Sequence, residues 1–186
     1  RRPPNAGRSA GRRPRPRRMT TDGWLRAQLD ATGAEYEIVP CDPDLADTAA
    51  FCAAYGYALE DSANTIVVVG KSAPPRYAAC VVLATTRLDV NRTVRHRLEV
   101  KKASFASAED TAALTGMMMG GVTVFGLPLD VPIWVDGRVM RRSRVVLGGG
   151  SRSCKVVAPP GILRSLANAE VVDDLALDPP PEVAVP

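Results

Sequence analysis

Two glycine-rich segments are the parts of this sequence best suited to hold a reactive group. The first runs Gly-Gly-Val-Thr-Val-Phe-Gly over residues 120–126, and the second is Gly-Gly-Gly-Ser-Arg over residues 148–152. Glycines let the backbone approach a ligand closely, and successive backbone N–H groups can then bind an anion or a carbonyl oxygen. Ser151 and Arg152 add a hydroxyl and a guanidinium group, which suit phosphate or carboxylate. Neither segment fits the dinucleotide-binding or P-loop pattern, so ordinary glycine-rich turns are the alternative interpretation.

Other catalytic chemistry has little support in the residue types. The four cysteines, Cys41, Cys52, Cys80 and Cys154, form no Cys-x-x-Cys pair, and His96 is the single histidine. A Cys/His metal site therefore has too few ligands at a usable spacing, and we expect no metal and no other cofactor. The cysteines are expected to be reduced, mostly buried thiols. No Ser/His/Asp nucleophile set can be placed in the sequence.

Net charge divides the chain into a basic tail and an acidic body. The 186 residues carry 24 Lys and Arg against 20 Asp and Glu, a formal charge of +4. Eight arginines fall in residues 1–18, which contain no acid, so residues 19–186 carry 16 basic and 20 acidic side chains, a net charge of −4. A basic pI by itself favours a nucleic-acid binder, but here it describes only the tail.

Composition predicts one globular domain with a tail at each end. Residues 1–18 should be disordered, residues 19–177 should form the domain, and the proline-rich residues 178–186 should form a second disordered tail. The first tail is either an RNA-binding arm or an overextended reading frame, since Met19 is a plausible start. No run approaches the roughly 18 apolar residues of a membrane span, and the N-terminus lacks the apolar part of a secretory signal. We therefore expect a cytoplasmic protein without a membrane partner.

Hydrophobic spacing predicts an α/β fold of the α+β type. Helices are expected over residues 21–33, from 44 or 47 to 56, and over 89–98, 107–116 and 160–166. Strands are expected over residues 35–39, 63–70, 77–85, 101–105, 133–135, 144–147, 155–157 and 170–172, the second and third forming a hairpin. Strands and helices alternate without a strict βαβ rhythm, which favours a mixed sheet with helices packed on it.

The order and spacing of four segments resemble the YbaK/EbsC-type domain, which is also the editing domain of bacterial prolyl-tRNA synthetases. These segments are residues 63–71, 101–116, 120–128 and 148–156. The resemblance runs from about Thr21 to Asp173, nearly the whole body of the chain. It implies a single domain with a mixed, curved β-sheet and helices packed around it.

The resemblance also implies an aminoacyl-tRNA deacylase acting in trans. Such a domain hydrolyses the ester between a wrong amino acid and the terminal adenosine of tRNA, typically tRNA-Pro carrying alanine or cysteine. Its partners would be the aminoacylated 3′ end of tRNA and, as a second candidate, an aminoacyl-tRNA synthetase; the oligomeric state is left open. Two arginine clusters could face the tRNA: Arg138, Arg141, Arg142 and Arg144, and Arg87, Arg92, Arg95 and Arg97.

The positions that match the family supply the candidate site residues. The candidate catalytic residues, which would orient the ester and the attacking water, are Asn64, Thr65, Gly121 and Thr123. The candidate substrate-binding residues are Lys102, Gly120, Phe125, Gly126, Gly150, Ser151 and Arg152. Lys102 and Arg152 would contact the terminal phosphate or ribose. An aminoacyl ester is already reactive, so positioned water and donors to its carbonyl oxygen can suffice.

Two positions depart from the family pattern. The family's lysine at the start of the central strand falls on Asn64, which can donate a hydrogen bond but carries no charge. The proline of the first glycine-rich loop falls on Val124, which lacks proline's fixed φ. Lys71 is a poor replacement, because it lies seven residues further on, about 23 Å along a strand and on its other face. The alternative hypothesis is a catalytically degenerate module that binds tRNA or an aminoacyl-adenosine-like ligand.

Overall fold

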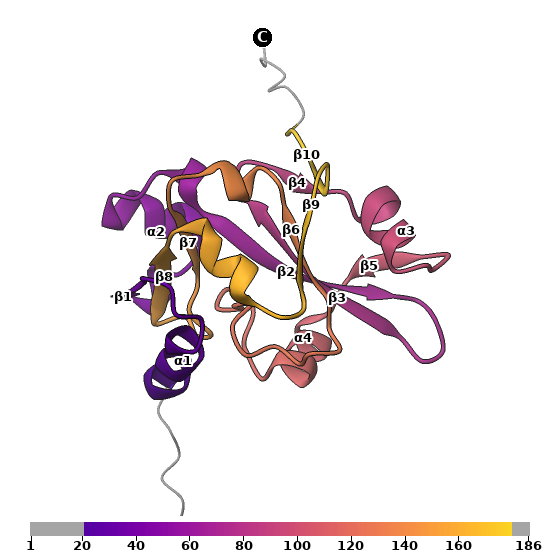
Figure 1. The fold of residues 1–186 in the computed structure, drawn as a ribbon, viewed down its shortest axis with the longest axis horizontal. Coiled ribbons are helices and arrows are strands. Elements are labelled where there is room, and N and C mark those ends of the chain that lie inside the picture. The colour runs from indigo at the N-terminus through magenta and orange to yellow at the C-terminus, as the bar shows by residue number, and fades with distance from the viewer. Residues whose placement is uncertain (1–20, 180–186) are drawn as a thin grey trace, which may run out of the picture.

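The strands form one five-stranded sheet, a three-stranded sheet beside it and a short two-stranded pair (Figure 1). A computed structural model describes residues 21–179 of the chain, so the predicted tail at residues 1–18 and most of the one at residues 178–186 lie outside it. The α-helices are α1 (Thr21–Asp30), α2 (Thr48–Tyr55), α3 (Arg95–Arg97) and α4 (Ala108–Thr115). None of the helices in the described part of the chain is long and apolar enough to cross a membrane.

The central sheet is mixed, as the sequence predicted. Its strand order is β5-β2-β3-β6-β9. The strands are β2 (Ala63–Gly70), β3 (Arg76–Leu83), β5 (Ala103–Phe105), β6 (Ile133–Asp136) and β9 (Ala169–Val172). The predicted hairpin of β2 and β3 is confirmed, and β5 adds an antiparallel neighbour to the far half of β2. On the other side, β6 runs parallel to β3 and β9 runs parallel to β6.

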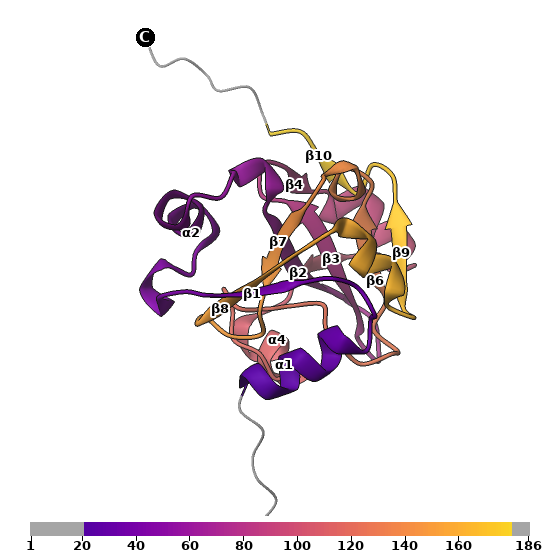
Figure 2. The ribbon, with the colours of Figure 1, turned by 60° about the vertical axis from the view of Figure 1, so that its left-hand side comes forward.

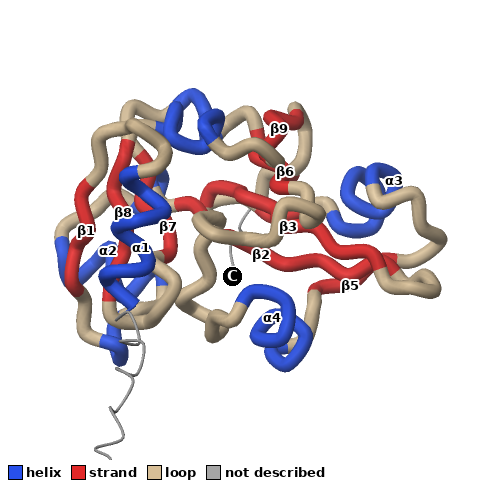
Figure 3. The backbone as a smooth tube through the Cα atoms, turned by 60° about the horizontal axis from the view of Figure 1, so that its bottom comes forward, coloured by secondary structure: helices blue, strands red, loops and turns tan. Residues whose placement is uncertain are grey.

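A second, antiparallel sheet carries the later glycine-rich segment. It consists of β1 (Glu37–Pro40), β8 (Cys154–Ala158) and β7 (Val145–Gly148), with β8 in the middle. Figures 2 and 3 show these three strands side by side, with α1 next to them. A single parallel bridge, between Ser62 and Val146, joins this sheet to the start of β2. The two-stranded pair of β4 (Arg87–Leu88) and β10 (Ala176–Leu177) was not predicted.

Most local signals placed the helices correctly. Gly56 ends α2 and Gly116 ends α4, both in the left-handed conformation expected at a helix C-terminus. The Ser107 hydroxyl accepts a hydrogen bond from the backbone N–H of Asp110 at 3.0 Å and so caps the N-terminus of α4. The predicted helix over residues 89–98 begins as a π-helical turn at Val90–Val94 and continues as α3, while Pro160–Ser165 forms a 3₁₀ helix.

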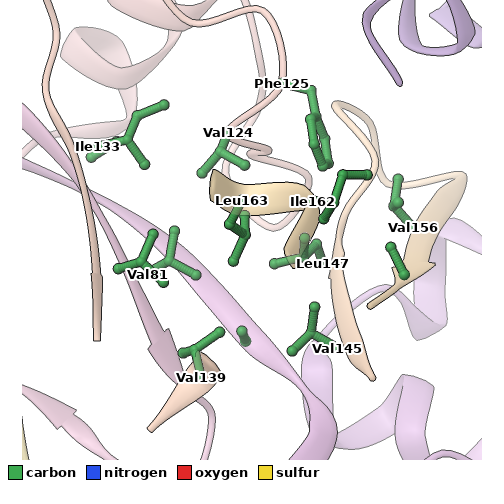
Figure 4. Packing of buried hydrophobic residues seen from close by; sticks show 14 of the residues in the cluster. Val81, Val124, Phe125, Ile133, Val139, Val145, Leu147, Val156, Ile162 and Leu163 are labelled. Carbon is green, nitrogen blue, oxygen red and sulfur yellow. The ribbon is translucent and has the colours of Figure 1, made fainter. Parts of the chain in front are cut away.

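The largest hydrophobic core joins both sheets and the first glycine-rich segment. Figure 4 shows Val124 and Phe125 of that segment packed among side chains of the strands and of the 3₁₀ helix. Leu25 and Leu29 of α1 belong to the same core. A second core lies on the other face of the central sheet, around Trp134 and Val94. Packing of the segment's apolar residues therefore fixes the position of the loop backbone.

The two glycine-rich segments contact each other directly through their backbones. The backbone N–H of Gly150 donates to the carbonyl oxygen of Gly121 at 2.7 Å. A Cβ atom at Gly121 would lie 2.5 Å from the backbone carbonyl carbon of Ser151, and one at Gly148 would lie 2.1 Å from the carbonyl oxygen of Val122. Atoms cannot approach this closely, so only glycine allows this packing. The two segments thus form one unit.

Gly148→Ala should therefore destabilise the protein by about 1–3 kcal/mol, because the added methyl group must push the two loops apart. Gly161→Ala is the matched control, since a Cβ atom there meets no heavy atom within 4 Å, and it should change stability by less than about 0.5 kcal/mol. Equilibrium denaturant unfolding measures both. Equal stability of the two variants would contradict the direct packing of the loops.

Candidate active site

A cavity of about 220 Å³ opens where the two sheets meet. Its walls come from the residues before and within the first turns of α2, the start of β2, the first glycine-rich loop, the end of β7 and Lys155 of β8. The bridge between Ser62 and Val146 lies at the point where the walls converge. The cavity thus collects polar groups from segments that are more than 100 residues apart in the sequence.

Asn64 faces the cavity with its amide oriented by a neighbour. The Thr48 hydroxyl at the start of α2 donates to the Asn64 side-chain oxygen at 2.8 Å. The Asn64 NH₂ group makes no hydrogen bond within the described residues, so its two N–H donors remain for another acceptor. Asn64 thus lines the cavity, and its role as a donor to a ligand stays a prediction.

Thr65 adds unpaired polar groups on the open edge of β2. The carbonyl of Val67 faces β5, because it accepts from the backbone N–H of Ala106 at 2.9 Å. Alternation along the strand puts the N–H and C=O of Thr65 on the same edge, before the pairing with β5 begins at Val68. The Thr65 hydroxyl is also buried without a hydrogen-bond partner within the described residues. This stretch of edge can therefore bind a polar ligand group.

Arg152 reaches the cavity rim from the second glycine-rich segment. Asp47 precedes α2 as its N-cap, but its side chain makes no capping hydrogen bond. Its carboxylate instead accepts from Arg152 Nη1 at 3.1 Å, and Arg152 Nε donates to the carbonyl oxygen of Pro43 at 3.0 Å. Asp47 lines the cavity, so this ion pair fixes the guanidinium group beside it.

Lys155 is a buried cation in the cavity wall that sequence reasoning did not single out. It is only 6% exposed, and its Nζ donates to the carbonyl oxygen of Ala46 at 2.6 Å. Nζ also lies 5.7 Å from the centre of the Phe51 ring. Burial lowers the pKa of the Lys155 ammonium group below its usual value, and Arg152 lowers it further, while Cys41 and Asp47 act in the opposite direction.

The structure places some predicted site residues on the cavity and others away from it. Asn64, Thr65 and Gly120 line the cavity, and Arg152 is paired with the lining residue Asp47. Gly121, Gly150 and Ser151 lie behind this wall, where the two loops pack on each other. Their contribution to the site is to hold the loops together.

The remaining predicted residues lie elsewhere. Thr123 and Phe125 are completely buried, and Phe125 belongs to the main core. Gly126 packs against Trp24 of α1, where a Cβ atom would lie 2.5 Å from the indole ring. Lys102 is exposed, and its carbonyl accepts from the N–H of Lys71, just beyond the far end of β2. None of these four side chains lines the cavity.

No group of His, Cys, Asp and Glu side chains within the described residues could hold a metal ion. All four cysteines are buried, and the prediction of mostly buried thiols is confirmed. Burial raises the pKa of the Cys80 thiol to about 12. Val124, which stands where the family pattern has proline, is a core residue.

The fold and the paired glycine-rich loops define the class of YbaK-like editing proteins. The family model of the aminoacyl-tRNA editing domain matches residues 42–166, well over half of the chain, and the chain belongs to that family. Every residue that lines the cavity falls within the matched range.

Individual relatives are more distant. The chain is 24% identical over 110 residues to a protein of Enterococcus faecalis named as a candidate Cys-tRNA(Pro)/Cys-tRNA(Cys) deacylase, EbsC. That match covers 59% of this chain and 65% of the relative. A hypothetical protein of known crystal structure superimposes with a TM-score of 0.73 at 23% identity, covering 83% of this chain and 99% of the other. A candidate trans-editing enzyme for prolyl-tRNA synthetase gives 0.70 at 23% identity, covering 82% and 95%.

The lowered pKa of Lys155 predicts how stability changes with pH. In the unfolded chain the ammonium group should have its usual pKa of about 10.4, so the folded chain loses this proton at a lower pH. Lys155 therefore destabilises the fold at neutral pH, and the penalty decreases as the pH rises towards about 10.4. Lys155→Met should be at least as stable as the wild type at pH 7. As the pH rises, the free energy of unfolding of the wild type should increase relative to that of Lys155→Met.

Denaturant unfolding of both proteins from pH 7 to 10 measures this difference. The other titrating groups, including Cys80, largely cancel when the two proteins are compared. Lys71→Met, at an exposed lysine, is the control and should follow the wild type throughout. Parallel curves for the wild type and Lys155→Met would contradict a buried ammonium group.

Proposed function

We propose that this chain is a trans-acting aminoacyl-tRNA deacylase of the cytoplasm, which hydrolyses the ester between a small, wrong amino acid and the 3′ end of tRNA. Alanine or cysteine on tRNA-Pro is the proposed substrate class, and prolyl-tRNA synthetase is the proposed source of the mischarged tRNA. The family assignment supports the reaction type. The names of the relatives support the choice of amino acid and tRNA.

The observation that carries the proposal is the cavity itself. All of its walls fall inside the family match, and its volume of about 220 Å³ is below the roughly 300 Å³ at which drug-sized ligand sites begin. Phe51, Val146 and Val122 form its apolar surfaces. A small aminoacyl group fits such a space, whereas a bulkier group would meet these side chains. Exclusion by size is the selectivity that an editing site needs.

The polar groups suit ester hydrolysis by a bound water molecule. The free N–H donors of Asn64 and the open edge at Thr65 can bind the carbonyl oxygen and the amino group of the substrate. Arg152 at the rim can contact the phosphate or ribose of the terminal nucleotide. Water then attacks the carbonyl carbon, the ester bond to the ribose oxygen breaks, and that oxygen takes a proton from the water. Holding these groups in place supplies much of the catalysis such a reactive ester requires.

A deacylation panel tests the proposal. Purified protein at micromolar concentration should hydrolyse Ala-tRNA-Pro or Cys-tRNA-Pro faster than the spontaneous rate and leave correctly charged Pro-tRNA-Pro intact. The expected selectivity is that of the proposed editing role, in which the correct product is spared. Release of labelled amino acid over time measures it. Hydrolysis of none of the misacylated tRNAs would overturn the deacylase proposal.

A non-catalytic binding module is the second candidate, and the lack of charge at Asn64 favours it. Asn64→Lys in the same panel separates the two. Activity in the variant alone would support a module that has lost its chemistry. Equal activity in both proteins would show that this chain hydrolyses the ester without a lysine at position 64. Binding of a non-hydrolysable aminoacyl-adenosine should be retained under either hypothesis.

A further inference from the structure

Lys155 is a buried charge that lacks the partner such a charge normally has. The side chain is only 6% exposed, and it forms no ion pair with any of the described residues. The carbonyl oxygen of Ala46 takes one N–H of the ammonium group, and the ring of Phe51 lies near it. An ammonium group has three donors, so two remain for a ligand in the cavity.

Structural reasons alone do not account for this lysine. Burying an ammonium group is costly, and an apolar side chain of the same length would fill the site at equal or greater stability. Buried ionisable groups without a full set of partners concentrate at functional sites. Lys155 also lies in the wall of the cavity that the family match contains. These two independent observations indicate that Lys155 is buried in order to bind a ligand rather than to stabilise the fold.

Strand pairing places Lys155 beside Gly148, and both residues line the cavity. Lys155 lies in the central strand of the second sheet, between Val39 of β1 and Gly148 of β7. Gly148 has no side chain because the carbonyl oxygen of Val122 packs against its backbone, and Gly148 and Val122 both line the cavity beside Lys155. The residues before α2 supply the carbonyl of Ala46, to which Nζ donates. The ammonium group is thereby fixed at the cavity wall.

The charges around the cavity leave this ammonium group free to act on a substrate. Asp47 is the only other charged residue among the described cavity-lining residues, and its carboxylate is paired with Arg152. Asn64 contributes donors but no charge. Lys71 and Lys102 lie beyond the opposite end of β2. Lys155 is therefore the one cation in the described cavity wall.

We propose that Lys155 is a catalytic residue, whose Nζ donates a hydrogen bond to the carbonyl oxygen of the scissile aminoacyl ester. This role rests on the proposed deacylase function. When water adds to the carbonyl carbon, the π electrons move to the carbonyl oxygen, and the ammonium group stabilises the negative charge there. Collapse restores the carbonyl and breaks the bond to the ribose oxygen, which receives a proton that came from the water. Lys155 keeps its own proton throughout.

Single-turnover and steady-state deacylation by Lys155→Met test this role. The variant should lose about 100-fold in kcat or more, because an oxyanion donor is removed, while KM changes by only a few fold. Lys155→Gln keeps a neutral N–H donor at this position, and its kcat should lie between those of the wild type and Lys155→Met. Lys71→Met should match the wild type. Circular dichroism and the unfolding curves check that each variant is folded.

The pH dependence gives a readout that a structural role would not change. The ratio of wild-type to Lys155→Met rates should fall at high pH, because the ammonium group loses its proton and with it the charge that stabilises the oxyanion. The groups facing Lys155 that titrate or carry charge are Cys41, Cys52, Asp47 and Arg152. They are present in both proteins, so the ratio isolates Lys155.

The outcomes separate the two proposals. Full activity of Lys155→Met, or a rate ratio independent of pH, would overturn the role of Lys155 and leave the deacylase function standing. Inactivity of the wild type on every misacylated tRNA would overturn the deacylase function and this role together. A loss of kcat in Lys155→Met with an intact fold would support both.

Discussion

The backbone contact between Gly121 and Gly150 is the constraint on which the site depends. It joins a loop that follows α4 to one that follows β7, although they are almost 30 residues apart, and no side chain larger than hydrogen fits between them. Val124 and Phe125 anchor the first loop in the core, and strand pairing anchors the second. Gly120, Val122 and Gly148 then form one continuous wall. The contact therefore holds in place the loop residues Gly120 and Val122 that line the cavity.

The positive net charge of the chain does not describe the surface of the folded body. The formal +4 combines a basic N-terminal segment, outside the described residues, with an acidic body. In the body, several arginines of the expected tRNA-facing clusters are already paired. Arg142 and Arg144 bind Asp61, and Arg138 binds Asp136 and Asp178. Contact with tRNA through the body would therefore depend on a few cations, and it should be weak and sensitive to salt.

Sequence patterns were sufficient for most of the fold. Helix ends at Gly56 and Gly116, the cap at Ser107 and the β2–β3 hairpin follow from local rules of spacing and capping. The division into separate sheets did not follow, because it depends on pairings between strands that are distant in the sequence. The β4–β10 pair was missed for the same reason and because each strand has only two residues.

The site was harder to predict than the fold. Matching to the family placed Asn64, Thr65 and Gly120 on the cavity, but it could not distinguish loop residues that face a ligand from those that face the core, such as Phe125. Lys155 had only a weak signal: a lysine in a short strand whose neighbours Cys154 and Val156 are apolar. Its burial becomes visible only when β8 is seen as a central strand with Gly148 beside it.

The most direct measurement of the central claim is a crystal structure with a non-hydrolysable substrate analogue, alanine joined through an amide to 3′-amino-3′-deoxyadenosine. The alanyl group should occupy the cavity beside Asn64 and Thr65, with its carbonyl oxygen within about 3.2 Å of Lys155 Nζ. An analogue bound with its alanyl group outside this cavity, or with its carbonyl directed away from Lys155, would contradict the account.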